Sequence, residues 1–283
     1  TLCRHTTFKV GGPCIAMVFV NSSESLSKLI SYCLNNEISY LVIGNGSNLL
    51  VDDKGFNGIV FKFSDALQEI KLVDCKTIKA YAGCQLSKLS HFAMENSLTG
   101  LEFAWGIPGT VGGATYMNAG AYGGEMKQVI KSVEAISADG DLVEIIPDEN
   151  TFSYRHSVFQ DNQMIVTAVC FSLEKGDKSQ IKAYMDDLMC KRKDKQPVEF
   201  PSAGSTFKRP EGAFAAALIE QCGLKGTTCG GAEVSTKHSG FIINKGNATC
   251  KDVLDLIDIV KKEVLQKTGF SLECEVKIIG WEE

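Results

Sequence analysis

The chain has 283 residues, of which 44% are hydrophobic, 22% charged and 8% aromatic. These values are typical of a folded globular protein and exclude a disordered or fibrous one. The net charge of −5 has the wrong sign for binding the phosphate backbone of nucleic acid. No apolar run approaches the roughly 18 residues that a membrane span requires, so no membrane insertion is expected.

The numbers and spacing of the cysteines and histidines argue against disulfide bonds and a metal site. Eleven cysteines, an odd number without any C-x-x-C pair, predict reduced thiols and a cytoplasmic protein. Four histidines without an H-E-x-x-H motif predict no metal site.

In chain order, the first elements form a helix followed by a strand and a glycine loop. Apolar residues recur at helical spacing over residues 24–37. A buried strand over residues 40–43 then runs directly into Gly44, Asn45, Gly46, Ser47 and Asn48. Further strands are predicted over 59–63 and 77–82, with a helix over 86–93.

The middle of the chain is rich in glycine. Residues 106–124 contain seven of the 27 glycines, whereas uniform scattering would place about two there. Residues 129–136 and 142–146 then predict a β-hairpin whose turn contains Asp139 and Gly140. A strand over 163–173 precedes the expected domain boundary at Gly176.

The second part of the chain again mixes helices and strands. A helix after Gly176 and another that ends at Gly223 are followed by a strand over 240–244. Thr249 and Asp252 have the form of a capping box that opens a third helix. In the last strand, residues 271–279, alternation places Glu275 on the polar face. The fold class is therefore α+β.

Several common motifs fail. The G-x-G-x-x-G fingerprint lacks its third glycine at residues 44–49, no P-loop is present, and the residues around Ser205 do not form a nucleophile elbow. The two glycine-rich loops are candidates for binding a pyrophosphate through their backbone amides. Tight turns at strand ends are the alternative, and they explain the first loop better than the second, whose glycine density is higher. From pattern alone, Ser205 also fits a turn serine, Arg155 a surface arginine and Glu275 a solvated strand residue.

Seven separated segments resemble one family. They are HTTFKVGGP (5–13), LVIGNGSNLL (41–50), GIPGTVGGA (106–114), NAGAYG (118–123), YR (154–155), PSAGSTFK (201–208) and EV (275–276). Their order and spacing are similar to those of the UDP-N-acetylenolpyruvoylglucosamine reductases, also called UDP-N-acetylmuramate dehydrogenases, over nearly the whole chain. Because no long insertion separates Arg155 from residue 201, the chain resembles the shorter family type, which lacks a tyrosine-bearing substrate loop.

This resemblance implies a fold and a cofactor. The fold is a two-lobed FAD-binding domain of the vanillyl-alcohol-oxidase-like (PCMH) type over residues 1–176, with lobes near 1–64 and 65–176, and a C-terminal α+β substrate domain over 177–283. The last strand could return to the first lobe. Non-covalent FAD would be bound by Gly44, Asn45, Gly46, Ser47, Asn48, Pro108, Gly109, Thr110, Gly112, Gly113, Asn118 and Gly120.

The resemblance also implies a reaction, the NADPH-dependent reduction of UDP-N-acetylglucosamine enolpyruvate to UDP-N-acetylmuramate in peptidoglycan precursor synthesis, with hydride passing through FAD. Arg155 would hold the substrate carboxylate and stabilise its enolic form. Glu275, protonated, would assist this polarisation, and Ser205 would donate the proton. The candidate substrate-binding residues are Tyr154, Lys208, Arg209, Lys237 and His238. Arg209 and Cys274 depart from the usual family pattern.

Two other functions are compatible with a flavin-binding fold. An oxidase of the same flavin fold would react with oxygen, and a binding protein would hold FAD or a nucleotide sugar without turnover. The joint presence of Arg155, Ser205 and Glu275 argues against both, since neither needs all three residues. No nucleic-acid partner is expected, and the chain is expected to be a monomer or a weak dimer.

Overall fold

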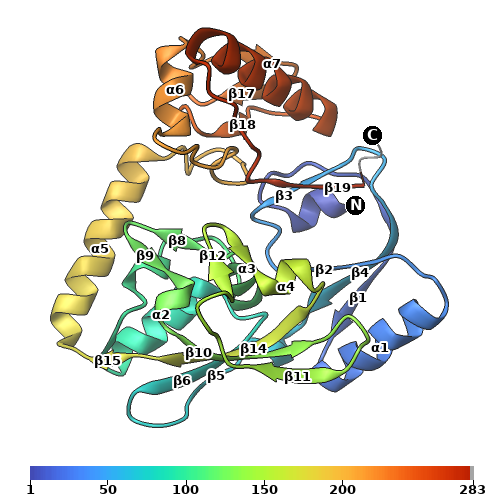
Figure 1. Ribbon diagram of the computed structural model, residues 1–283, viewed down its shortest axis with the longest axis vertical. Helices are drawn as coiled ribbons and strands as arrows, with labels where there is room; N and C mark the ends of the chain where they lie inside the picture. Colours follow the sequence, from blue (N-terminus) through green and yellow to red (C-terminus); the bar gives the residue numbers. More distant parts are fainter. Residues whose placement is uncertain (281–283) are drawn as a thin grey trace. The chain divides into compact units, whose positions relative to one another are not determined.

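The computed structural model describes residues 1–280. The chain forms two compact units. The first combines Thr1–Ile15, Gly46–Asn57 and the chain from Arg192 onward, and the second combines Ala16–Asn45 with Gly58–Lys191 (Figure 1). Within the described residues, no helix is both long enough and apolar enough to cross a membrane.

The second unit is built on a five-stranded antiparallel sheet with the order β11-β10-β14-β6-β5. Its central strand β14 is buried along most of its length, and the neighbouring strands bury Ile78, Ala80, Val133 and Ala135. The strands are β5 (Ile70–Leu72), β6 (Thr77–Tyr81), β10 (Ile130–Ile136), β11 (Leu142–Ile145) and β14 (Ile165–Ser172).

Helices of this unit bury one apolar stripe each. In α2 the buried residues Leu86, Leu89 and Ala93 recur at helical spacing, and α3 lies against β14. In α1 the side chain of Ser22 accepts a hydrogen bond from the N–H of Ser25 and so caps the helix. The helices are α1 (Ser23–Asn35), α2 (Leu86–Glu95), α3 (Val111–Tyr116) and α4 (Val158–Asp161).

A smaller sheet of the second unit has the order β1-β4-β2, in which β2 is parallel to β4. Short strands form the remaining pairs of this unit, and α5 (Lys178–Lys195) begins in it. The strands are β1 (Cys14–Val20), β2 (Tyr40–Ile43), β4 (Phe56–Phe63), β7 (Leu98–Thr99), β8 (Gly120–Ala121), β9 (Gly124–Glu125), β12 (Phe152–Ser153), β13 (His156–Ser157) and β15 (Glu174–Lys175), and the 3-10 helices are Asp65–Leu67, Glu102–Ala104 and Met126–Gln128.

The first unit packs two helices with a three-stranded sheet, and its strands β3 and β19 form a separate parallel pair (Figure 1). The capping box predicted for α7 is confirmed, because Thr249 and Asp252 exchange backbone and side-chain hydrogen bonds. The elements are a 3-10 helix (Leu2–His5), β3 (Leu49–Val51), α6 (Ala215–Gln221), β16 (Thr228–Cys229), β17 (Ala232–Val234), β18 (Ile242–Asn244), α7 (Cys250–Thr268) and β19 (Lys277–Ile279).

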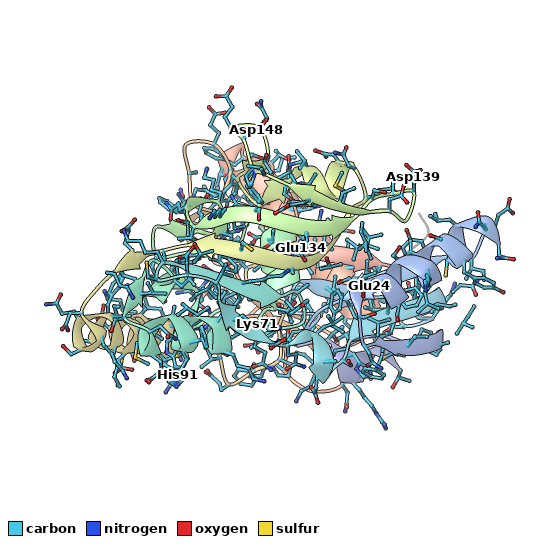
Figure 2. All side chains as sticks on the ribbon, turned by 90° about the horizontal axis from the view of Figure 1, so that it is seen from below. Glu24, Lys71, His91, Glu134, Asp139 and Asp148 are labelled. Carbon is cyan, nitrogen blue, oxygen red and sulfur yellow. The ribbon has the colours of Figure 1, made fainter. Side chains whose placement is uncertain are left out.

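The predicted β-hairpin in the middle of the chain is confirmed. Ile136 pairs with Leu142, and Gly140 in the turn has φ 93°. Figure 2 shows Asp139 at the tip of this hairpin, whereas Glu134 lies along the sheet and pairs with Lys79. The turn residues therefore determine where β10 ends and β11 begins.

The division into units differs from the expected boundary at Gly176. Helix α5 remains with the second unit as far as Lys191, because Ile181 and Met185 pack with Met94. The first unit also includes two N-terminal stretches, and β19 pairs with β3. Each unit is therefore made of separate stretches of the chain, and no single boundary divides the sequence into the two units.

Candidate active site

Two glycine-containing loops that are about sixty residues apart in sequence meet in the second unit. The side-chain amide of Asn45 donates a hydrogen bond to the carbonyl of Pro108 at 3.2 Å. A Cβ atom added to Gly44 would lie 2.2 Å from Oγ1 of Thr110. The contact between the loops therefore requires glycine at residue 44.

The other part of the first loop, which belongs to the first unit, offers free backbone donors. Within residues 1–280, no acceptor is hydrogen-bonded to the N–H groups of Gly46, Ser47 and Asn48. Gly46 has φ 59°, and a Cβ on it would lie 2.5 Å from the carbonyl oxygen of His5. Consecutive unpaired amides are a suitable cradle for a phosphate, so this segment fits the pyrophosphate of FAD.

The two glycines in the first turn of α3 have different roles. The N–H groups of Val111 and Gly112 donate to the carbonyls of Cys84 and Ala82, at 2.8 and 2.9 Å. A Cβ on Gly112 would lie 2.8 Å from Cβ of Ala82, whereas one on Gly113 would have no atom nearer than 3.6 Å. Close packing against the protein explains Gly112, and only Gly113 has room beside it.

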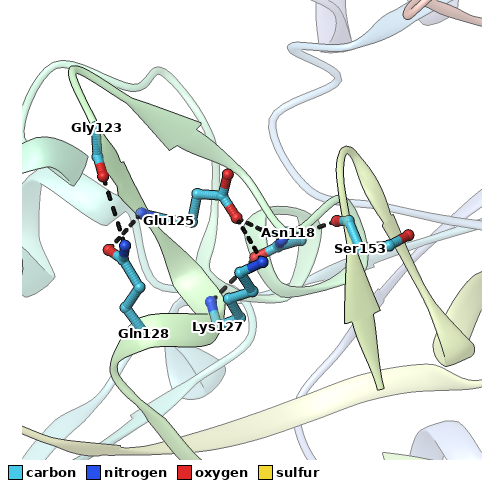
Figure 3. Close-up of polar contacts among 6 residues, drawn as sticks. All are labelled: Asn118, Gly123, Glu125, Lys127, Gln128 and Ser153. Carbon is cyan, nitrogen blue, oxygen red and sulfur yellow. Dashed lines mark hydrogen bonds and ion pairs between the residues drawn. The ribbon is translucent and has the colours of Figure 1, made fainter. Parts of the chain in front are cut away.

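Asn118 is fully buried and has φ 41°. Its side-chain amide donates to the carbonyl of Ser153 at 2.9 Å and to Oε2 of Glu125 at 3.1 Å, and its oxygen accepts from the N–H of Lys127 at 3.0 Å (Figure 3). These three bonds use the donors of the side chain and one acceptor position of its oxygen. The amide therefore connects the residues after α3 with the hairpin of β12 and β13.

Arg155 occupies the turn of that hairpin and has φ 56°, a conformation that is uncommon for residues other than glycine. One guanidinium nitrogen, Nη2, donates to the carbonyl of Gly120 at 3.0 Å. The guanidinium carbon lies 5.3 Å from the centroid of the Tyr154 ring. Because Tyr154 is half exposed, this cation and its neighbouring ring lie at the surface of the second unit.

The backbone segments that contain Ser205 and Glu275 lie side by side in the first unit. The N–H of Glu275 donates to the carbonyl of Thr206 at 2.8 Å, and Phe207 and Cys274 form an antiparallel bridge. Thr206 is fixed on its other side, because its N–H donates to the carbonyl of Gly240 and its Oγ1 accepts from Ile242. Within the part of the chain that the structure describes, the Ser205 hydroxyl has no hydrogen-bond partner.

Lys208 and Arg209 continue the segment that contains Ser205. The Lys208 ammonium lies 3.3 Å from Oε2 of Glu273, and the Arg209 guanidinium stacks 4.4 Å from the centroid of the exposed Phe214 ring. Burial and the charge of Lys208 lower the pKa of Lys277. The first unit therefore presents several cations on the residues that follow Ser205 and Glu275.

The other two candidate substrate residues lie in the turn after β17. Lys237 donates to the carbonyl of Lys193 at 2.6 Å and lies 3.6 Å from Oε2 of Glu199. His238 accepts a hydrogen bond at Nδ1 from the N–H of Gly240, and burial lowers its pKa. Since Gly240 also accepts from Thr206, the histidine is connected to the Ser205 segment through one residue.

Sequence reasoning missed three contributors to this arrangement. Phe214 supplies the ring beneath Arg209, and Glu125 holds the amide of Asn118. The alternation that placed Glu275 on the polar face also places Lys277 there, two residues later, but nothing in the sequence indicated that this lysine belongs to the site. The other two depend on contacts between segments, which residue spacing does not reveal.

Comparison with protein families matches both parts of the chain. Residues 14–146 match an FAD binding domain, and residues 196–279 match the C-terminal domain of UDP-N-acetylenolpyruvoylglucosamine reductase. The chain is therefore an FAD-dependent oxidoreductase with an α+β fold.

Individual relatives are similar over almost the whole chain. The chain is 52% identical to a UDP-N-acetylenolpyruvoylglucosamine reductase from Clostridium novyi, over 99% of this chain and 90% of the relative. It is 49% identical to the one from Caldanaerobacter subterraneus, over 98% and 91%. The crystal structure of the Thermus caldophilus enzyme matches with a TM-score of 0.83 and 37% identity, over 98% of this chain and 97% of that one. The chain belongs to the UDP-N-acetylenolpyruvoylglucosamine reductase family.

Proposed function

We propose that the protein reduces UDP-N-acetylglucosamine enolpyruvate to UDP-N-acetylmuramate with electrons from NADPH, a step of peptidoglycan precursor synthesis. Family membership supports the substrate class. The observation that carries the proposal is that the backbone segments of Ser205 and Glu275 lie side by side, joined by the hydrogen bond from Glu275 to Thr206 and by the bridge between Phe207 and Cys274. Two segments joined in this way can bring a hydroxyl and a carboxyl to one site for delivering a proton.

The residues present fit the cofactor. The unpaired amides of Gly46, Ser47 and Asn48 would hold its phosphates, with Gly44, Asn45, Pro108, Gly109, Thr110, Gly113 and Gly120 as further candidates. Gly112 would contribute by packing the second loop. When bound, FAD supplies the two-electron chemistry that the side chains lack.

Addition of a hydride to the terminal vinyl carbon of the enol ether leaves negative charge at the carbon that carries the carboxylate. Arg155 would hold that carboxylate and stabilise the enolic charge, because a fixed cation acts strongly where charge develops. Glu275, in its protonated form, would assist the same polarisation. Ser205 would then protonate the carbon, which requires close placement because a serine hydroxyl is a weak acid in water.

Lys208, Arg209, Lys237 and His238 would contact the diphosphate and uridine of the substrate, and Tyr154 would contact the portion near Arg155. The chain offers no second dinucleotide fingerprint, so NADPH and the nucleotide sugar would use one pocket in turn. The eleven cysteines without a paired spacing favour a reducing compartment, so the reaction would take place in the cytoplasm.

A colour experiment tests the function. The purified protein should be yellow, should bleach on addition of NADPH without oxygen, and should regain its colour on addition of the enolpyruvyl nucleotide sugar. Rapid recovery with oxygen alone would instead indicate an oxidase. Absence of recovery with the nucleotide sugar would refute the proposed substrate. Initial-rate lines that intersect rather than run parallel would refute the shared pocket.

A further inference from the structure

The buried amide of Asn118 contacts the hairpin that carries Arg155. Its Nδ2 donates to the carbonyl of Ser153, two residues before the arginine. The hairpin is also anchored by Gln160, which donates to the carbonyl of Arg155 at 3.3 Å, and by Ser157, which donates to the carbonyl of Tyr116 at 2.6 Å. The backbone that carries the guanidinium is therefore tied to the segment after α3 at several points.

Glu125 determines which way this amide faces. The nitrogen and oxygen of an asparagine side chain have nearly the same shape, so neighbouring groups set their orientation. The Glu125 carboxylate accepts from Nδ2, and the N–H of Lys127 can only donate to Oδ1 (Figure 3). These two neighbours direct the remaining Nδ2 hydrogen toward the carbonyl of Ser153.

Glu125 is itself fixed. It forms a capping box with Gln128, whose Oε1 accepts from the N–H of Glu125 at 2.9 Å, and its carboxylate lies 3.4 Å from the Lys127 ammonium. Glu125 also pairs with Gly120 across β8 and β9, and the carbonyl of Gly120 accepts from the Arg155 guanidinium. The short hairpin of β8 and β9 therefore acts on Arg155 in two ways. Gly120 binds its guanidinium directly, and Glu125 holds Asn118, which binds the backbone of the arginine hairpin.

We propose that Asn118 and Glu125 are positioning residues that hold Arg155 in its left-handed turn, with its guanidinium aimed for the substrate carboxylate. This inference rests on the proposed function of Arg155. It assigns the Asn118 side chain a role toward the arginine hairpin rather than toward FAD, because the amide is fully buried and both of its N–H donors are used within the protein. The two roles predict different outcomes on substitution.

The most informative variant is Asn118→Asp. The new carboxylate cannot donate to Ser153 and faces Glu125, whose oxygen lies 3.1 Å from Nδ2 in the native protein. Two carboxyls so close share one proton at low pH and repel each other at high pH. The shared proton removes the repulsion and restores the contact with Glu125, although the bond to Ser153 stays lost, so the defect should be largest in alkaline solution and should recover in part as the pH falls.

Two half-reactions of the FAD-loaded protein separate the roles. Asn118→Asp should keep its FAD and bleach with NADPH at the native rate. The return of colour with the enolpyruvyl nucleotide sugar should slow about tenfold or more, because small displacements of a positioned group are costly. Asn96→Asp is the matched control, since this asparagine donates one side-chain bond to the carbonyl of Phe92 at the end of α2.

Three further variants test the same contact. Glu125→Gln retains an acceptor and should behave like the native protein, whereas Glu125→Ala should show the slowed colour return even if Asn118→Asp fails to fold. In the double variant Asn118→Asp with Glu125→Gln, the acid recovery should move to lower pH, because one negative charge is gone. Amide hydrogen exchange of residues 153–157 in the protein without FAD should quicken in Asn118→Asp and not in Asn96→Asp.

The outcomes are distinguishable. Loss of FAD, or equal slowing of both half-reactions, would overturn the inference in favour of a cofactor-binding role. Behaviour of Asn118→Asp that matches the control at every pH, with unchanged hydrogen exchange, would also overturn it. If the native protein itself never regains colour with the nucleotide sugar, the proposed function fails, while the exchange data still report whether Asn118 holds the hairpin.

Discussion

The side-chain amide of Asn48 donates a hydrogen bond to the backbone carbonyl of Glu275 at 3.1 Å. In return, the carbonyl of Asn48 accepts from the N–H of Lys277 at 2.9 Å. The last residue of the first glycine loop is thereby fixed against the segment that carries the candidate carboxyl, directly before β19. The loop that would hold phosphate and the segment whose carboxyl would polarise the substrate are consequently parts of one hydrogen-bonded structure.

Replacing Ser205 with alanine should separate the two halves of the reaction. Bleaching by NADPH should remain close to native, whereas colour return with the enolpyruvyl nucleotide sugar should slow by about two to four orders of magnitude, the usual contribution of a general acid. Rapid-mixing absorbance measures both rates. Ser202→Ala, in the same segment, is the control; equal losses in both halves would reject the proton-donor role.

The adjacent glycines in the first turn of α3 should respond oppositely to alanine. Gly112→Ala would place its Cβ 2.8 Å from that of Ala82 and should destabilise the protein by about 1–3 kcal/mol. Gly113→Ala has no atom nearer than 3.6 Å and should stabilise the helix slightly. Urea unfolding measures both changes. The double variant Gly112→Ala with Ala82→Gly should regain stability, and no recovery would contradict the packing explanation.

Acidification should weaken the fold through His238. Burial holds the pKa of this imidazole below its ordinary value of 6.5, which the unfolded chain retains. Below about pH 6.5 the unfolded chain therefore binds more protons, so stability falls as the pH falls toward the folded pKa. His238→Asn retains an acceptor for Gly240 and should lose less stability between about pH 7.5 and about pH 5.5. His156→Asn, which replaces a half-exposed histidine, is the control. It should lose as much stability as the native protein between these two pH values.

The cysteines should react in order of exposure. Cys75 and Cys190 are exposed, whereas burial raises the pKa of Cys84 to about 11 and that of Cys250 to about 12. Because the thiolate is the reactive form, a coloured disulfide reagent should modify the two exposed thiols quickly and the two buried ones only after unfolding. Mass spectrometry identifies the modified residues, and rapid labelling of Cys84 in the folded protein would contradict the assignment.

Local patterns predicted the elements well, and the sequence resemblance predicted the family. The Asp139 and Gly140 turn and the Thr249 capping box succeed because residues close in sequence determine them. Strand β1 was missed, since its neighbours in the sheet come from later in the chain. The hairpin turn at Arg155 was missed for a similar reason, because the donors that anchor it lie on segments outside the turn.

The sequence identified candidate residues but not the contacts that bring their segments together. The pattern alone could not choose between a solvated Glu275 and one in a site, and the hydrogen bonds with Thr206 and Asn48 are what place it beside the Ser205 segment. Glycine density was also ambiguous. It marked residues 106–124 correctly as unusual, but Gly112 is explained by contact with Ala82 rather than by an open approach to a ligand.

The parallel pairing of β3 with β19 joins Leu49 to Lys277, residues that leave the ribosome far apart in time. Until the final strand is synthesised, the N-terminal segments of the first unit lack the residues they pair with. The second unit, composed of Ala16–Asn45 and Gly58–Lys191, is by then fully synthesised. Synthesis therefore imposes an order of assembly, and a chain that stops short of β19 would leave β3 as an unprotected edge open to aggregation.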